Sequence, residues 1–383
     1  MKVLRKKTRQ RRFIKRLKEN VLNYIQTIPE IRLFLCILIM ISFILIMIDA
    51  LPWDKDSFLG RIIIEAHGLI PELLIFGILI TVYNKIVVER IIEIRRIQEE
   101  INDYKERNDN EAKIVIKNRI KKLNKLGFTK IDLSRCHLEN TKLFNVRLNN
   151  ANLYFTNLEG ANLESAILDN AILTSSVLRG AYLEGARFKS AKLDHADLER
   201  AYNRGEKAVW FNLADLSFAN LQNARFREGY FDKANFFNAN LSGISLRFCS
   251  LKEADLRHAN LEGAELIGIN LTMANLFQAK LKYAVIKTYY EELSHGGPIH
   301  YIATFNKANL EGADLEGAEL ENVDFTDANL TGANLVNIKG VTIGQISKAK
   351  TLYQAKLDHN LEKLIRERFP HLLDKPKLKE TIG

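Results

Sequence analysis

The sequence predicts a long solenoid of short repeats, preceded by hydrophobic helices at a membrane and closed by a helical cap. Three observations predict it. Large apolar residues recur every five positions from Leu133 to about residue 338. Sixteen consecutive residues near the N-terminus, 33–48, carry no charge. A helical pattern of apolar residues returns after Leu335. The chain therefore divides at about residues 30, 88, 127 and 340 into a basic tail, a membrane segment, a helical connector, the repeat region, and a cap with its tail.

The positive charge of the chain lies next to the hydrophobic segments. Residues 1–127 contain 25 Lys and Arg against 15 Asp and Glu, whereas residues 128–340 contain 22 against 26. This distribution favours attraction to anionic lipid headgroups over a nucleic-acid groove along the repeat region. Ten Lys and Arg fall within the first eighteen residues, so nucleic-acid binding by the tail 1–30 is the disfavoured alternative.

The segment 31–51 is predicted to span the membrane. Its 21 residues would form a helix of roughly 31 Å, about one hydrocarbon core. The competing interpretation is a secretory signal peptide. Because the preceding basic region is long and no small-x-small cleavage site follows Asp49, we expect the segment to be retained.

The segment 69–88 is a weaker second span. Glu72 and Lys85 bracket it, and Pro71 lies near its start, so an amphipathic helix on the membrane surface is the alternative. Basic residues flank both segments on the outer sides, and flanking Lys and Arg stay cytoplasmic. We therefore expect a multi-pass protein of a prokaryotic plasma membrane, with both termini and the repeat region cytoplasmic. An ion pathway at Glu72 has little support from one carboxylate.

The connector 89–127 is predicted to be helical. Ile94, Ile97, Ile101 and Tyr104 follow helical spacing, and a second helical stretch ends near Gly127 after an interruption at residues 108–110. Two interpretations stay open: self-association through this stalk, and packing of a monomeric helix on the first coil of the solenoid.

The repeat region is defined by its period. Runs of fourteen, fifteen and seven pentads begin at Leu133, Leu216 and Phe305, and 29 of the 36 central residues are Leu. Two positions before the centre, 25 of 36 residues are Ala. Neither an α-helix nor a flat strand buries one face with a period of five. The chain must therefore turn about every five residues, with the centre and the small residue pointing inward.

Stretches such as Ala308–Gly317 (ANLEGADLEG) resemble the pentapeptide-repeat family, whose pattern is Ala-(Asp/Asn)-Leu-x-x. The resemblance covers more than half of the chain. It implies an all-β, right-handed quadrilateral β-helix with four pentads per coil. Some members of the family are DNA mimics that bind type II topoisomerases, which implies a topoisomerase regulator as one candidate function.

Two interruptions of the repeat predict loops at about residues 200–213 and 288–302. Insertions in solenoids often form the binding face. Their aromatic and histidine residues are the predicted partner contacts: Trp210, Phe211, Tyr289, Tyr290, His295, His300 and Tyr301. The alternative is that these side chains fold back on the solenoid wall. A metal shared by His295 and His300 lacks a third ligand.

After Leu335 the sequence predicts a cap at residues 341–369 and a solvated tail. Thr342 and Gln345 fit a capping box, and Leu361, Leu364, Ile365 and Phe369 form an apolar stripe. Such a cap covers the last coil, whose edge would otherwise pair with other chains.

The motifs favour a binding protein without catalysis. The sequence contains no Gly-rich phosphate loop, zinc-ligand quartet, nucleophile elbow or HExxH, and three cysteines make no disulfide framework. We expect no catalytic residue, metal or cofactor. The leading hypothesis is a membrane-tethered scaffold that presents a rigid rod to a protein partner, with lipid as the second partner. The alternatives are a DNA mimic, for which the repeat region is only weakly acidic, and an accessory subunit of a channel or transporter.

Overall fold

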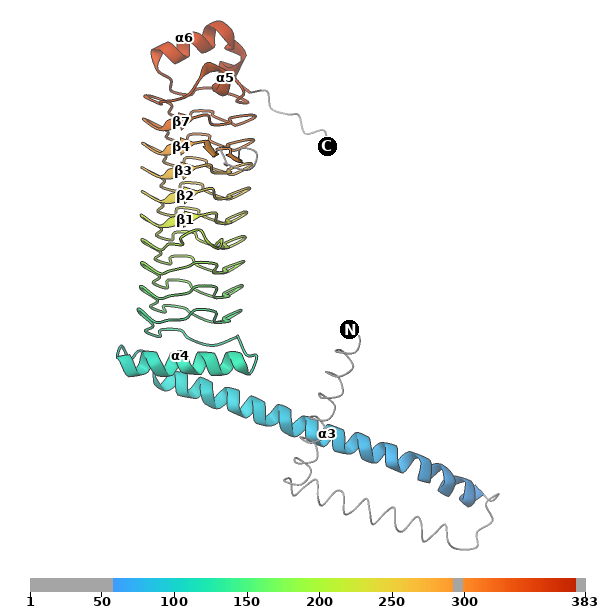
Figure 1. Ribbon diagram of the computed structural model, residues 1–383. Helices are drawn as coiled ribbons and strands as arrows, with labels where there is room; N and C mark the ends of the chain where they lie inside the picture. Colours follow the sequence, from blue (N-terminus) through green and yellow to red (C-terminus); the bar gives the residue numbers. More distant parts are fainter. Residues whose placement is uncertain (1–57, 292–298, 377–383) are drawn as a thin grey trace. The chain divides into compact units, whose positions relative to one another are not determined.

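The computed structural model describes residues 58–291 and 299–376. The chain forms two compact units, residues 1–95 and 96–383, and helix α3 (Phe58–Asp103) contributes residues to both. The second unit is a tall stack of coils, drawn from green to red in Figure 1. The predicted β-helix is confirmed.

Helix α3 contains the segment 69–88, for which a second membrane span was predicted. Across the described parts of the chain, no helix combines the length and the apolar character that crossing a membrane needs. The span 69–88 is therefore not supported. In the sequence, Lys85 and Arg90 follow the apolar part of this segment, and α3 continues to Asp103 with many charged residues. The basic tail 1–30 and the first predicted span, 31–51, lie outside the described residues.

Each coil consists of four pentads, and parallel bridges join residues twenty positions apart. Asp132 pairs with Asn152, for example, and Asn152 with Ile172. The bridging residue precedes each inward centre, and its side chain points outward. These columns define four faces, which are named by their first bridging residues: face 1 from Asp132, face 2 from His137, face 3 from Lys142 and face 4 from Arg147.

The corner between two faces is a tight turn. The N–H of Ala151, for example, donates to the carbonyl of Leu148 at 3.0 Å, and Asn150, the third of the four residues in this turn, has φ of 58°. A hydrogen bond of this span with positive φ at the third residue defines a type II turn. This position tolerates Gly and Asn best, because their left-handed conformation costs least. The turn explains why a period of five closes into a square coil.

The core consists of the centres and the small residues that precede them. Leu138, Ala151 and Leu163 are fully buried, as the repeat predicted. Under face 4 the core is aromatic: the rings of Phe188 and Phe211 stack at 4.6 Å and those of Phe211 and Phe231 at 5.0 Å. Aromatic pairs at such distances add stability beyond the area that they bury.

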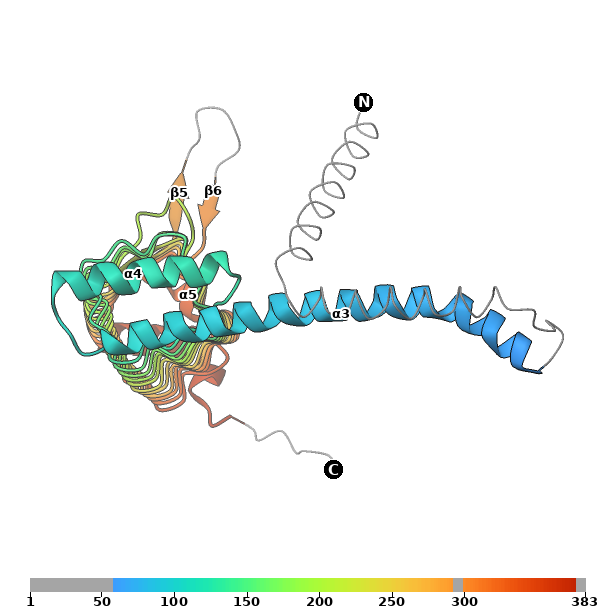
Figure 2. The same ribbon diagram turned by 90° about the horizontal axis from the view of Figure 1, so that it is seen from below.

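Short strands form where the ladder is most regular. On face 3 a parallel sheet has the order β1-β2-β3-β4-β7. Its strands are β1 (Arg225–Arg227), β2 (Ser245–Arg247), β3 (Glu265–Ile267), β4 (Val285–Lys287) and β7 (Glu319–Glu321). Strands β5 (Tyr289–Glu291) and β6 (Ile299–Tyr301) form an antiparallel hairpin that projects from the wall (Figure 2).

Helices cover the first coil. Helix α4 (Asn110–Lys125) lies across it in both views, with Ile116 and Ile120 buried (Figures 1 and 2). The side chain of Asn124 donates to the carbonyl of Arg147 and accepts its N–H, both at 2.7 Å. These bonds satisfy backbone groups that a terminal coil would otherwise leave unpaired. Packing of the connector on the first coil, one of the two open interpretations, is what the structure shows.

The C-terminal end differs from the prediction. The capping box at Thr342 and Gln345 is present and begins helix α5 (Ile343–Ile346). The ladder then resumes, because Thr351 pairs with Asn329 and Lys356 with Asn334. The predicted boundary at residue 340 is therefore too early, since α5 is a short insertion within a coil. Helix α6 (His359–Arg368) and the 3₁₀-helix η1 (Pro370–Leu373) follow and close the stack (Figure 1).

Candidate interaction surface

The two interruptions of the repeat lie at the same corner of the solenoid. Across most of face 4 the bridged residues are 20 positions apart, but Arg187 pairs with Trp210, 23 positions later. Likewise Asn270 pairs with Thr304, 34 positions later. Face 3 is still regular immediately before each step, where Tyr182 pairs with Tyr202. The three extra residues of the first insertion and the fourteen of the second therefore both leave the regular coil between face 3 and face 4.

The shorter insertion is the loop 204–208, which is held by a buried carboxylate. Glu184 is only 1% exposed. Its carboxylate accepts the backbone N–H of Arg204 at 2.6 Å, that of Gly205 at 3.2 Å, and that of Lys207. A buried charge is tolerated when it accepts several hydrogen bonds of this kind. The predicted loop 200–213 is thus too long, because Tyr202 and Trp210 both belong to regular bridges.

The longer insertion is the β5–β6 hairpin, and its base packs on one aromatic ring. Phe248 lies 4.2 Å from the ring of Tyr301 and 5.1 Å from that of Tyr289. Gly268 makes this approach feasible, because a Cβ at its position would lie 2.5 Å from the Cβ of Tyr301. Farther out, the rings of Tyr290 and His300 meet edge to face at 5.2 Å.

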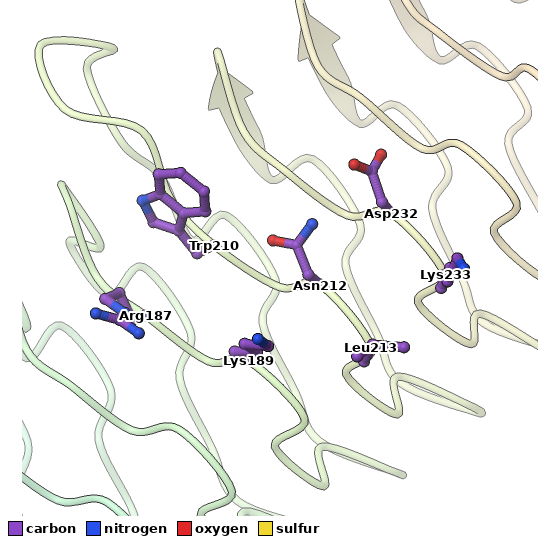
Figure 3. A pocket seen from close by; sticks show the side chains of 7 residues that line it. All are labelled: Arg187, Lys189, Trp210, Asn212, Leu213, Asp232 and Lys233. Carbon is purple, nitrogen blue, oxygen red and sulfur yellow. The ribbon is translucent and has the colours of Figure 1, made fainter.

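Trp210 and Tyr230 form an exposed aromatic pair on face 4. Their rings stack at 4.3 Å, while 41% of Trp210 and 39% of Tyr230 stay exposed. A lower groove of about 690 Å³ surrounds Trp210, and its side chains come from three successive coils (Figure 3). Its lining consists of Arg187, Lys189, Trp210, Asn212, Leu213, Asp232 and Lys233.

An upper groove of about 600 Å³ continues from Tyr230 to the hairpin. Tyr230, Phe248, His300, Tyr301 and Asp324 are among its lining residues. Because Tyr230 belongs to the upper groove and stacks on Trp210 of the lower one, the two grooves form one continuous surface. We call this surface, from Arg187 to Asp324 along face 4, the face-4 surface.

The repeats match a known family model. Pentapeptide repeats match at residues 131–170, 166–202, 214–251, 244–282 and 303–339, with 8 copies. The solenoid is a pentapeptide-repeat domain. None of the curated proteins matches the chain.

Three solved structures are similar to part of this chain. HetL, involved in heterocyst differentiation regulation in the cyanobacterium Nostoc sp. strain PCC 7120, is 26% identical at a TM-score of 0.36, covering 62% of this chain and 93% of its own. QnrB1, a plasmid-mediated fluoroquinolone resistance protein, is 20% identical at a TM-score of 0.28, covering 61% and 97%. A protein of the thylakoid lumen of Arabidopsis thaliana is 28% identical at a TM-score of 0.18, covering 30% and 64%.

The predicted contact residues fall into distinct places on this pentapeptide-repeat solenoid. Trp210 is exposed on the face-4 surface, and Tyr290 and His300 are exposed on the hairpin. The prediction that Phe211 contacts a partner is wrong, because Phe211 is a fully buried centre of the repeat. Tyr289 and Tyr301 pack on Phe248 at the base of the hairpin, as the alternative interpretation of folding back on the wall expected. His295 lies outside the described residues.

Sequence reasoning missed the residues that surround Trp210. Tyr230 follows Trp210 by twenty positions, which is one coil, and Arg187 precedes it by one coil plus the insertion. The twenty-residue period would have placed Tyr230 beside Trp210. Arg187 carries no such signal until the length of the loop 204–208 is known.

The surface contains no group with obvious chemical reactivity. Within residues 58–291 and 299–376, no three His, Cys, Asp or Glu side chains gather as metal ligands. Burial raises the pKa of the Cys249 thiol to about 12, and burial does the same for Cys136. Because the thiolate is the reactive form of cysteine, these two thiols are inert at neutral pH. The arrangement is suited to binding.

Proposed function

We propose that this protein is a non-catalytic scaffold that binds a protein partner through the face-4 surface. The observation that supports the proposal is the position of the two insertions. Both lie at the corner beside face 4, four coils apart, and the stacked pair of Trp210 and Tyr230 lies between them on that face. A regular solenoid has four equivalent faces, and these insertions distinguish one of them.

The side chains of this surface are those that dominate protein interfaces. Trp, Tyr and Arg are enriched among the residues that carry most of the binding free energy. Trp210 is held by Tyr230 before a partner binds, so little conformational entropy remains to be lost. Arg187, Lys189 and Lys233 surround it; Arg187 pairs with Asp169 at 2.7 Å and Lys233 with Glu253 at 3.3 Å, while Lys189 favours a partner whose aromatic or apolar segment carries an acidic group beside it.

The partner is tested by crosslinked affinity purification of full-length protein from native membranes. The double variant Trp210→Ala/Tyr230→Ala should recover a specific partner at least about tenfold less well than wild type, because truncation of interface hot spots typically costs 2 kcal/mol or more. Tyr283→Ala is the matched control, since Tyr283 is 59% exposed and lies on the turn between faces 2 and 3. Equal recovery by the double variant and the control would place the interface elsewhere.

A membrane tether is the second part of the proposal, and it rests on the sequence of residues 31–51 and the basic tail before it. The tether would hold the solenoid at the cytoplasmic face and restrict where the partner meets it. Deletion of residues 1–57 should release the protein from the membrane fraction. If the shortened protein stays with the membranes, residues 1–57 are not the anchor.

Charge pairing weighs against the DNA-mimic alternative. Residues 303–335 hold seven acidic residues against Lys307, but several of them face lysines of the coil below. Lys282 lies 2.9 Å from Glu316, and Lys287 lies 3.0 Å from Glu319. A rod that imitates DNA needs an acidic row without such partners. An accessory role for a channel or transporter would appear in the same purification as a larger membrane protein.

A further inference from the structure

A second pair of grooves adjoins on face 3, across the loop 204–208 from the face-4 surface. One groove, of about 690 Å³, is lined by Arg200, Tyr202 and Arg225 among others. The other, of about 470 Å³, is lined by Arg204, Arg225, Arg227 and Arg247. Arg225 and Asn203 belong to both. The two linings together contain five arginines and a single carboxylate, that of Glu265. We call these two grooves the arginine grooves.

Aromatic rings hold several of these guanidinium groups in place. Arg204 lies 5.6 Å from the ring centre of Tyr182, and Arg227 lies 5.2 Å from that of Phe248. A guanidinium that stacks on a ring keeps its N–H edge available for an anion. The ring of Tyr182 also packs on that of Tyr202 at 5.2 Å. These ring faces are therefore occupied within the protein, which disfavours stacking of nucleic-acid bases on them.

The floor of the grooves is built from a polar residue where the repeat otherwise has Leu. Asn203 occupies a centre of the repeat and is 6% exposed. Its side-chain amide donates to the carbonyl of Arg227 at 3.0 Å, and its oxygen accepts the N–H of Arg227 at 2.9 Å. These two bonds fix the backbone of an arginine that lines the groove. A Leu at this position would leave both groups of Arg227 without these partners.

Few carboxylates compete for the arginines. Arg200 lies 3.4 Å from Glu199, Arg227 lies 3.4 Å from Glu228 and Arg247 lies 4.0 Å from Glu265, each of them a single contact. Among the described residues, no carboxylate lies within ion-pair distance of Arg204 or Arg225. An anion that enters the grooves would therefore meet guanidinium groups with donors to spare, in the geometry that suits phosphate and carboxylate.

We propose that the arginine grooves bind an extended peptide segment that carries two phosphorylated or acidic side chains. The arginines come from three successive coils, which at strand spacing cover about 10 Å. Alternate side chains of an extended peptide are about 7 Å apart, so two anionic groups fit this length. The site lies on a different face from Trp210, so substitutions can alter the arginine grooves and the face-4 surface separately.

The test uses purified full-length protein and a fluorescent, otherwise neutral peptide with two phosphoserines separated by one residue. Binding is followed by fluorescence polarisation, with the unphosphorylated peptide and a short oligothymidylate as comparison probes. The variant Arg225→Ala/Arg227→Ala should weaken binding of the phosphopeptide about a hundredfold, or about tenfold for each charge-assisted contact. Arg225→Lys/Arg227→Lys should fall between wild type and the Ala variant, because lysine keeps the charge and loses the planar fork.

Arg257→Ala is the matched control. Arg257 is exposed to a similar degree, lies on the turn between faces 1 and 2, and pairs with Asp255. It should leave the affinity for the phosphopeptide within about twofold of wild type, as expected for a surface change far from the site. Thermal unfolding checks that all variants stay folded. The proposal is overturned if the phosphopeptide does not bind saturably, if Arg257→Ala weakens binding equally, or if the oligonucleotide binds more tightly than the phosphopeptide.

Discussion

Faces 2 and 4 share one backbone and differ in what their outward residues do. On face 2, Asp197, Asn220, Asn240 and Asn260 stand above one another. Asn220 donates to Asp197 at 3.1 Å, Asn240 to Asn220 at 3.1 Å, and Asn260 to Asn240 at 3.4 Å. On face 4 the same rows carry Arg187, Trp210 and Tyr230. The outward groups of face 2 bond to one another, whereas on face 4 Trp210 and Tyr230 stack on each other and keep part of their ring area exposed.

The difference shows that the repeat leaves the outward position free to vary. Backbone bridges and buried centres hold the coil on both faces, so neither depends on the outward side chain for its existence. A ladder of amides satisfies its own hydrogen-bonding groups and presents a uniform polar wall. Aromatic and cationic residues leave apolar area and donors in solvent, and such a surface gains free energy when a partner covers it.

The largest effect is expected from the core beneath face 4. Phe211→Ala removes a ring that packs between Phe188 and Phe231 and should lower the free energy of unfolding by about 3–5 kcal/mol. Urea unfolding measures it. Trp210→Ala, one residue away and 41% exposed, should cost about 1 kcal/mol or less. If Trp210→Ala lowered the free energy of unfolding more than Phe211→Ala, the assignment of Phe211 to the core would be wrong.

The corner beside face 4 should be sensitive to the buried carboxylate. Glu184→Ala leaves three backbone N–H groups without their acceptor, and should cost about 2 kcal/mol. Hydrogen exchange at the amides of residues 204–207 should accelerate in this variant. Glu206→Ala changes an exposed carboxylate in the same loop and is the control. Equal exchange in the two variants would mean that Glu184 does not position the loop.

A substitution on face 2 should lower the free energy of unfolding less, because each side chain of its amide ladder makes only modest contacts. Asn240→Ala removes the bond to Asn220 and the acceptor that Asn260 and the N–H of Ser242 use. We expect a loss of about 1 kcal/mol in the free energy of unfolding. An unchanged urea midpoint would show that the ladder satisfies the hydrogen-bonding groups of face 2 without stabilising the fold.

The smallest effect on stability is expected from low pH, through the carboxyl of Asp324 at the upper end of face 4. Burial raises the pKa of Asp324, but hydrogen bonds from Thr326 and from the hydroxyl of Thr304 outweigh it and hold this pKa below its usual range. A carboxyl whose pKa is depressed in the folded state stabilises the protein at neutral pH, and this contribution is lost as the pH falls below about 4. Asp324→Asn should flatten this part of the pH dependence of thermal unfolding between pH 3 and 7. A profile that matches wild type would exclude Asp324 as its source.

The sequence by itself determined the coil. A strict period of five with Leu at the centre and Ala two residues earlier permits one way to bury both, and the observed centres from Leu133 to Leu335 follow it. The capping box at Thr342 was equally readable, because it depends on residues three positions apart. Local chemistry of this kind needs no knowledge of distant segments.

Only the tertiary structure decided which face differs from the others. The two interruptions lie far apart in the chain, and their placement at one corner depends on the count of residues in every coil between them. Three extra residues near residue 205 put Phe211 in the core and Trp210 at the surface, although both stand in the same break of the pattern. A shift of one residue exchanges inward and outward positions, because neighbouring side chains point to opposite sides of the wall. Register is a property of the closed coil, so the surface could be assigned only after the coil was built.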